Sequence, residues 1–95
     1  MQERNDKPPD AVVELAFPAS FPIKILGRPE GGLTRAVIEI VCRHVPDFVP
    51  GTLESRPSKK GKYLSLTATV NATSREQLDA LYRELCDHPA VVMVL

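Results

Sequence analysis

The sequence predicts an α+β domain of the ferredoxin-like βαββαβ type, in which a four-stranded antiparallel sheet carries two helices on one face. The first observation is the order of the patterns, which runs strand, helix, strand, strand, helix, strand along the 95 residues. Two such strand–helix–strand units with right-handed crossovers place both helices on the same side of one sheet. The second observation is segment 62–71, whose apolar and polar residues alternate, as expected of a sheet that is covered on one side only.

A chain of this length forms one domain. We place that domain at residues 17–95. Residues 1–16 are predicted to form a flexible N-terminal tail, because the chain begins with a polar segment that contains proline and has no periodicity.

The first half of the domain is predicted to contain a strand, a loop and a helix. Residues 21–26 form the strand, since Phe21, Ile23 and Ile25 fall on one face. One proline and three glycines interrupt residues 27–32, which makes that segment a loop. The helix covers residues 33–44, and its apolar stripe consists of Leu33, Ala36, Val37, Ile40 and Val41.

A hairpin of two strands follows. Residues 52–56 form a short strand between Pro50 and Pro57, and flanking prolines suit the edge of a sheet. The polar residues 58–61 form the turn, and residues 62–71 form the partner strand.

A capping box is predicted to open the second helix. The hydroxyl of Ser74 accepts from the N–H of Gln77, and the Gln77 side chain reaches back. The helix covers residues 75–87, and its stripe consists of Leu78, Leu81, Tyr82 and Leu85. The last strand, residues 90–95, is apolar on both faces, although it lies at an edge and exposes half of its side chains on the uncovered face. Two covers are possible: Val12, Val13, Leu15 and Phe17 folding back over it, or a second copy of the chain in a homodimer.

Composition narrows the class of protein. Twelve basic and twelve acidic residues give a formal net charge of zero, which argues against binding to nucleic acid or to a membrane surface through bulk charge. No segment approaches the length of a membrane span, and the polar residues 1–10 lack the apolar stretch of a signal peptide, so we expect a cytoplasmic protein. Cys42 and Cys86 are then expected to be free thiols.

Several separated segments resemble the small, uncharacterised bacterial YbeD-like proteins. The matching segments are 17–27, which reads FPASFPIKILG, then 57–63, 70–73, 76–85 and 92–95. The resemblance covers residues 17–95 and implies a fold similar to ACT-type regulatory domains. It also implies a lipoate-binding or lipoate-related regulatory role, with no established functional residues. The chain departs from the family pattern at Glu30-Gly31-Gly32, where its loop is more flexible.

The loop between the first strand and the first helix is the predicted ligand site. A helix N-terminus presents free N–H groups and the positive end of the helix dipole, which favours an anion such as a carboxylate. Gly31 and Gly32 allow close approach to the backbone. The predicted ligand-binding residues are Gly27, Arg28, Gly31, Gly32 and Arg35. The alternative is a connector whose glycines serve only the turn.

No catalytic residue, metal ligand or cofactor is predicted. The two histidines are His44, at a helix end, and His88, in a turn; Cys86 and His88 are two residues apart and diverge if the helix continues. We therefore expect a regulatory or binding protein that is not an enzyme. Two alternatives are a protein-interaction adaptor that uses the open sheet face and the last strand, and weak RNA binding through the basic hairpin of Arg56, Lys59, Lys60 and Lys62.

Overall fold

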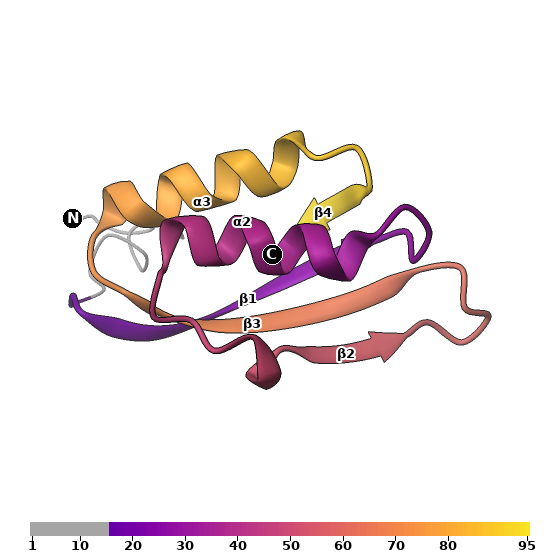
Figure 1. The fold of residues 1–95 in the computed structure, drawn as a ribbon, viewed down its shortest axis with the longest axis horizontal. Helices are drawn as coiled ribbons and strands as arrows, with labels where there is room; N and C mark the ends of the chain where they lie inside the picture. The colour runs from indigo at the N-terminus through magenta and orange to yellow at the C-terminus, as the bar shows by residue number, and fades with distance from the viewer. Residues whose placement is uncertain (1–15) are drawn as a thin grey trace, which may run out of the picture.

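In a computed structural model, which describes residues 16–95, both helices lie on one side of a four-stranded sheet (Figure 1). The strand order is β2-β3-β1-β4, and every neighbouring pair is antiparallel. This arrangement confirms the predicted ferredoxin-like fold. The elements are β1 (Ala19–Gly27), α2 (Leu33–His44), the short 3-10 helix η2 (Pro50–Thr52), β2 (Glu54–Pro57), β3 (Leu64–Ala72), α3 (Arg75–Asp87) and β4 (Val91–Val94).

The core lies between the helices and the sheet, and the predicted apolar stripes form it. Every second residue of β1 and β3 points toward the helices and is buried or partly buried, because removing apolar surface from water drives the layers together. The fully buried large side chains are Ile23, Ile25, Leu33, Val37, Val41, Val45, Leu66, Val70, Leu81 and Leu85. Ala36 and Tyr82, which the stripes also included, are only partly buried at the margin of this core.

The start of α3 confirms half of the capping box. The backbone N–H of Gln77 donates to Ser74 Oγ at 3.0 Å. The Gln77 side chain reaches back one residue farther than a capping box requires, since its Oε1 accepts from the backbone N–H of Thr73 at 2.7 Å. Its Nε2 donates to the carbonyl oxygen of His44 at 3.0 Å. The last carbonyls of a helix lack partners within it, so Gln77 satisfies the end of α2 from the neighbouring helix.

Each of the four strands differs from its predicted bounds by one or two residues at each end, and the later starts of β2 and β3 have a local cause. The strand expected at residues 52–56 begins at Glu54, because the N–H and the hydroxyl of Thr52 both donate to the carbonyl of Val49 and close a 3-10 turn. The strand expected at residues 62–71 begins at Leu64, because residues 58–63 close the hairpin with a bond from the Ser58 N–H to the Tyr63 carbonyl. The edge position of β2 is confirmed.

β4 pairs with only the end of β1. The N–H of Lys24 donates to the oxygen of Leu95, and the N–H of Leu95 donates back to Lys24. Pro22 lies two residues before Lys24, so its backbone nitrogen points to the same edge of β1 as the N–H of Lys24. At Pro22, no strand of residues 16–95 lies along that edge. A proline is therefore tolerated in a central strand, because its missing N–H leaves no ladder bond unmade there.

The predicted tail lies almost wholly outside the described residues, as do Val12, Val13 and Leu15. Phe17 is described, and it packs against the core. Within residues 16–95, neither helix is long and apolar enough to cross a lipid bilayer.

Candidate functional site

The candidate site lies on the face of the sheet that the helices leave uncovered. The pairing of β3 with both of its neighbours sets the residues of this face. Thr67 of β3 lies opposite Lys24 of β1 and opposite Glu54 of β2. One pleat along, Ser65 lies opposite Arg56 of β2. The open face therefore carries two hydroxyls along its centre, with charged side chains on either side.

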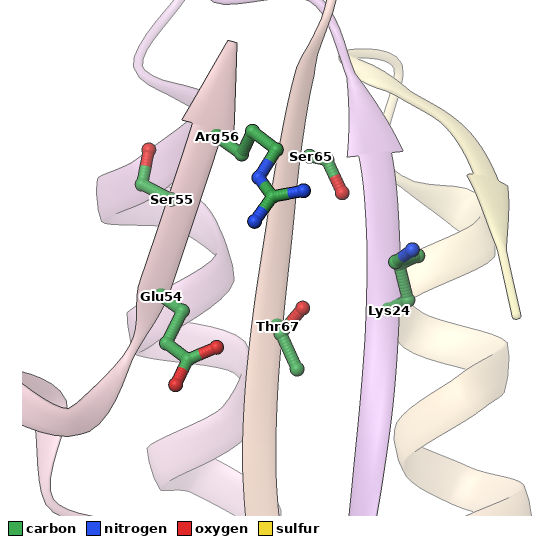
Figure 2. Close-up of a pocket in the computed structure, with 6 residues that line it drawn as sticks. All are labelled: Lys24, Glu54, Ser55, Arg56, Ser65 and Thr67. Carbon is green, nitrogen blue, oxygen red and sulfur yellow. The ribbon is translucent and has the colours of Figure 1, made fainter.

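These side chains line a hollow of about 220 Å³ on the open face (Figure 2). The Arg56 side chain extends from β2 over β3, so that its guanidinium group lies above the central strand, and Lys24 stands on the far side of β3. Ser65 and Thr67 are partly buried, whereas Lys24, Glu54 and Arg56 are exposed. The hollow is thus a shallow polar depression whose rim is charged.

An apolar corner adjoins the hollow where β1 meets β4. Leu26 lies opposite Met93, and the register between the two strands shifts after this pair. The side chains of Val92, Met93 and Leu95 are 46%, 48% and 63% exposed. We call Leu26, Val92, Met93 and Leu95 the apolar corner. The open face therefore combines a polar, charged half over β2 and β3 with an apolar edge.

The loop predicted to bind a ligand, residues 27–32, contributes no residue to this hollow. Gly31 and Gly32 adopt left-handed backbone conformations, with φ of 80° and 74°, and Gly32 is the N-cap of α2 without a side-chain cap. Gly27 serves packing, because a Cβ there would lie 2.5 Å from the carbonyl oxygen of Ala90 and 2.8 Å from Leu33 Cδ1. The glycines of this loop are explained by turn geometry and by close approach.

The two arginines of the predicted site point to no shared cavity. The backbone N–H of Arg28 donates to the Ala90 carbonyl at 3.0 Å, and Arg28 is exposed. Arg35 lies in the first turn of α2, and its Nε is 3.7 Å from Oε2 of Glu39. Three hollows of the described surface are lined by other residues. The loop site therefore stays a prediction.

Both histidines make hydrogen bonds within the fold. His44 Nε2 lies 2.7 Å from Glu84 Oε1, and Arg43 donates to Oε2 of the same carboxylate. The hydrogen bond from Arg43, and next the contact with His44, lower the pKa of Glu84. His88 Nδ1 accepts from the backbone N–H of Ala90 at 3.1 Å.

Cys42 and Cys86 are both free thiols. No group of three or more potential metal ligands occurs within residues 16–95.

The basic hairpin offers one aromatic ring. Lys59, Lys60 and Lys62 are exposed, and the Lys62 ammonium lies 5.7 Å from the centre of the Tyr63 ring. Sheets of this architecture that bind RNA stack successive bases on exposed aromatics of the open face. The open face of β3 carries hydroxyl side chains at Ser65, Thr67 and Thr69 instead.

The sequence pattern did not predict the hollow. Arg56 was interpreted only as part of the basic hairpin, and the polar residues of segment 62–71 only as the uncovered face of their strand. The strand register would have identified this site. When Glu54, Thr67 and Lys24 are aligned across β2, β3 and β1, the charged side chains fall on either side of the hydroxyls of β3.

The protein is an α+β domain whose fold is similar to that of ACT domains. The structure is similar to the crystal structure of the ACT domain from GTP pyrophosphokinase of Chlorobium tepidum, with a TM-score of 0.56. The two share 17% sequence identity over 81% of this chain and 97% of that one. This likeness confirms the expected fold.

Residues 13–95 match the family described as "Protein of unknown function (DUF493)". The UPF0250 protein of Leptothrix cholodnii is 54% identical over 85% of this chain and 89% of that protein. The UPF0250 protein of Nitrosomonas europaea is 53% identical over 85% and 93%, and that of Ralstonia nicotianae is 44% identical over the full length of both. The chain belongs to this UPF0250 family, which confirms its resemblance to the YbeD-like proteins.

Proposed function

We propose that the protein is a non-catalytic regulatory module that binds a small carboxylate on the open face of its sheet. The observation that carries the proposal is the hollow in which Lys24 and Arg56 flank the hydroxyls of Ser65 and Thr67 (Figure 2). Arginine and lysine are the usual partners of carboxylates, and an arginine can bind one with two parallel hydrogen bonds. The ACT-like fold supports a regulatory role, and lipoate is the carboxylate that the family resemblance implies.

The proposal is tested by titrating the protein with lipoate, octanoate and a set of amino acids. Calorimetry measures the affinity, and backbone amide shifts in a nitrogen–proton NMR spectrum locate the ligand. We expect saturable binding of at least one carboxylate, with shifts on β1 and β3. A flat titration with every compound contradicts the proposal.

A second candidate function, a protein-interaction adaptor, is favoured by the apolar corner. Val92, Met93 and Leu95 expose large apolar side chains within the last four residues of the chain, and exposed apolar patches often mark interaction surfaces. Capture of partners from a bacterial lysate with the wild-type protein and with Met93→Lys tests this role. A partner that is captured by the wild type and lost in Met93→Lys supports the adaptor; a wild-type capture without any enriched protein contradicts it.

A further inference from the structure

The hollow holds more positive than negative charge, and its cations have no ion-pair partner among residues 16–95. The ion pairs of this part of the chain join Arg35 to Glu39, and Arg43 and His44 to Glu84. Lys24 and Arg56 take no part in them, although both rim the same hollow. Within residues 16–95, no ion pair neutralises their positive charge.

Glu54 is the one acidic residue that lines the hollow. It lies opposite Thr67, on the same side of β2 as Arg56, because residues two apart in a strand share a face. Glu54 makes no ion pair within the described residues, so it reduces the charge of the hollow without neutralising either cation. Two positive charges and one negative charge leave the hollow with a net charge of +1.

We infer that this hollow binds the carboxylate of a small molecule between Lys24 and Arg56, and that Glu54 reduces its preference for doubly charged anions. Arg56 and Lys24 approach the ligand from opposite sides of β3, and Ser65 and Thr67 can donate hydroxyl hydrogen bonds from below. A phosphate monoester carries up to one more negative charge at the same head group. Its extra charge strengthens both the attraction to the two cations and the repulsion from the Glu54 carboxylate, so Glu54 reduces the advantage that a dianion would otherwise have over a monoanion. The inference rests on the proposed function and specifies its ligand class and its residues.

Octanoate and octyl phosphate test the inference, since they share a hydrocarbon chain and differ in the charge of the head group. At about pH 8 the phosphate is a dianion, because its second pKa is about 6. We expect the wild-type protein to bind octanoate saturably and to prefer octyl phosphate by less than Glu54→Gln does. In Glu54→Gln both affinities should rise, and that for octyl phosphate should rise more, by roughly threefold to tenfold. An unchanged preference in Glu54→Gln overturns the role of Glu54.

Charge-removing variants test the site itself. Lys24→Ala and Arg56→Ala should each weaken octanoate binding by about threefold to tenfold, the range expected for one charge-assisted contact at an exposed site. Arg28→Ala and Arg35→Ala are matched controls, because each removes one exposed cation from the predicted loop site, and binding should stay within about twofold of the wild type. Both target side chains are exposed, so the variants should fold, and urea unfolding checks this.

The outcomes separate this inference from the proposed function. Binding that is lost in Arg28→Ala and kept in Lys24→Ala and Arg56→Ala overturns the hollow, while a carboxylate-binding module still stands. Equal weakening in all four variants reveals attraction to overall charge and overturns the hollow as a specific site. A flat titration of the wild type with lipoate, octanoate, amino acids and octyl phosphate overturns both the hollow and the small-carboxylate function.

Discussion

The Tyr82 hydroxyl of α3 donates a hydrogen bond to the backbone oxygen of Leu95, and the two oxygen atoms lie 3.2 Å apart. The same Leu95 oxygen accepts from the N–H of Lys24. One atom thus joins a helix, the end of the last strand and the strand that carries a cation of the hollow. The hydrogen bond from Tyr82 fixes the end of β4 against α3. β4 pairs with only part of β1 and carries residues of the apolar corner.

Tyr82→Phe is expected to loosen this end of the sheet. Loss of a hydrogen bond at a partly exposed site should lower the free energy of unfolding by about 0.5–1.5 kcal/mol, measured by urea denaturation. The amides of Lys24 and Leu95 should also exchange with solvent faster. Tyr63→Phe is the control, because the Tyr63 hydroxyl makes no hydrogen bond within residues 16–95. Equal exchange rates in Tyr82→Phe and the wild type would show that the bond does not hold β4.

The Glu84 carboxylate is expected to make stability depend on pH in the acid range. Its pKa in the folded protein lies below the ordinary value, chiefly because Arg43 donates a hydrogen bond to it and then because His44 does. A lowered folded pKa contributes stability above the unfolded pKa of 4.5, and that contribution is lost as the pH falls through the folded pKa. Urea unfolding between about pH 6 and pH 3 should therefore show a steeper fall in stability for the wild type than for Glu84→Gln.

Glu39→Gln is the matched control for this pH series. Glu39 also faces an arginine, but the contact with Arg35 is 3.7 Å long and both side chains are exposed. Exposed ion pairs contribute little to stability. The dependence of stability on pH in Glu39→Gln should therefore follow that of the wild type. A dependence as weak as that of Glu84→Gln would contradict the conclusion that the contacts of Glu84 with Arg43 and His44 cause it.

Gly27→Ala is expected to destabilise the fold through steric overlap. The added Cβ would lie 2.5 Å from the backbone oxygen of Ala90, which cannot move without shifting the chain before β4. Overpacking of this kind costs about 1–3 kcal/mol of unfolding free energy. Gly51→Ala is the control, since a Cβ there meets nothing within 4 Å, and its stability should equal or slightly exceed the wild type. Equal thermal midpoints for the two variants would refute the close approach at Gly27.

Ser74→Ala is expected to weaken the start of α3. The Ser74 hydroxyl accepts the backbone N–H of Gln77, one of the first N–H groups of the helix that have no partner within it. Loss of an N-cap side chain costs about 1 kcal/mol, measured by urea denaturation. Ser20→Ala changes an exposed serine on the open face and should leave stability unchanged. A Ser74→Ala variant as stable as Ser20→Ala would mean that the cap contributes nothing.

The sequence by itself determined the order of the elements and which face of each is buried. Apolar spacing in residues 33–44 and 75–87 follows the helical repeat, and alternation in residues 64–72 follows the pleat, so both patterns are local and readable. The N-cap at Ser74 was predictable for the same reason, because donor and acceptor are three residues apart. The segments that resemble the YbeD-like proteins also indicated the family that the comparisons confirm.

Only the tertiary structure decided which polar side chains meet. Lys24 and Arg56 are brought to one hollow by the register of three strands, and register depends on how whole strands pack, which no local pattern specifies. The same holds for Gln77, whose side chain turns from its own helix to the last carbonyl of α2 because the two helices lie side by side. Local periodicity thus predicts the layers of this protein, while strand pairing and helix docking place the charges that a ligand would contact.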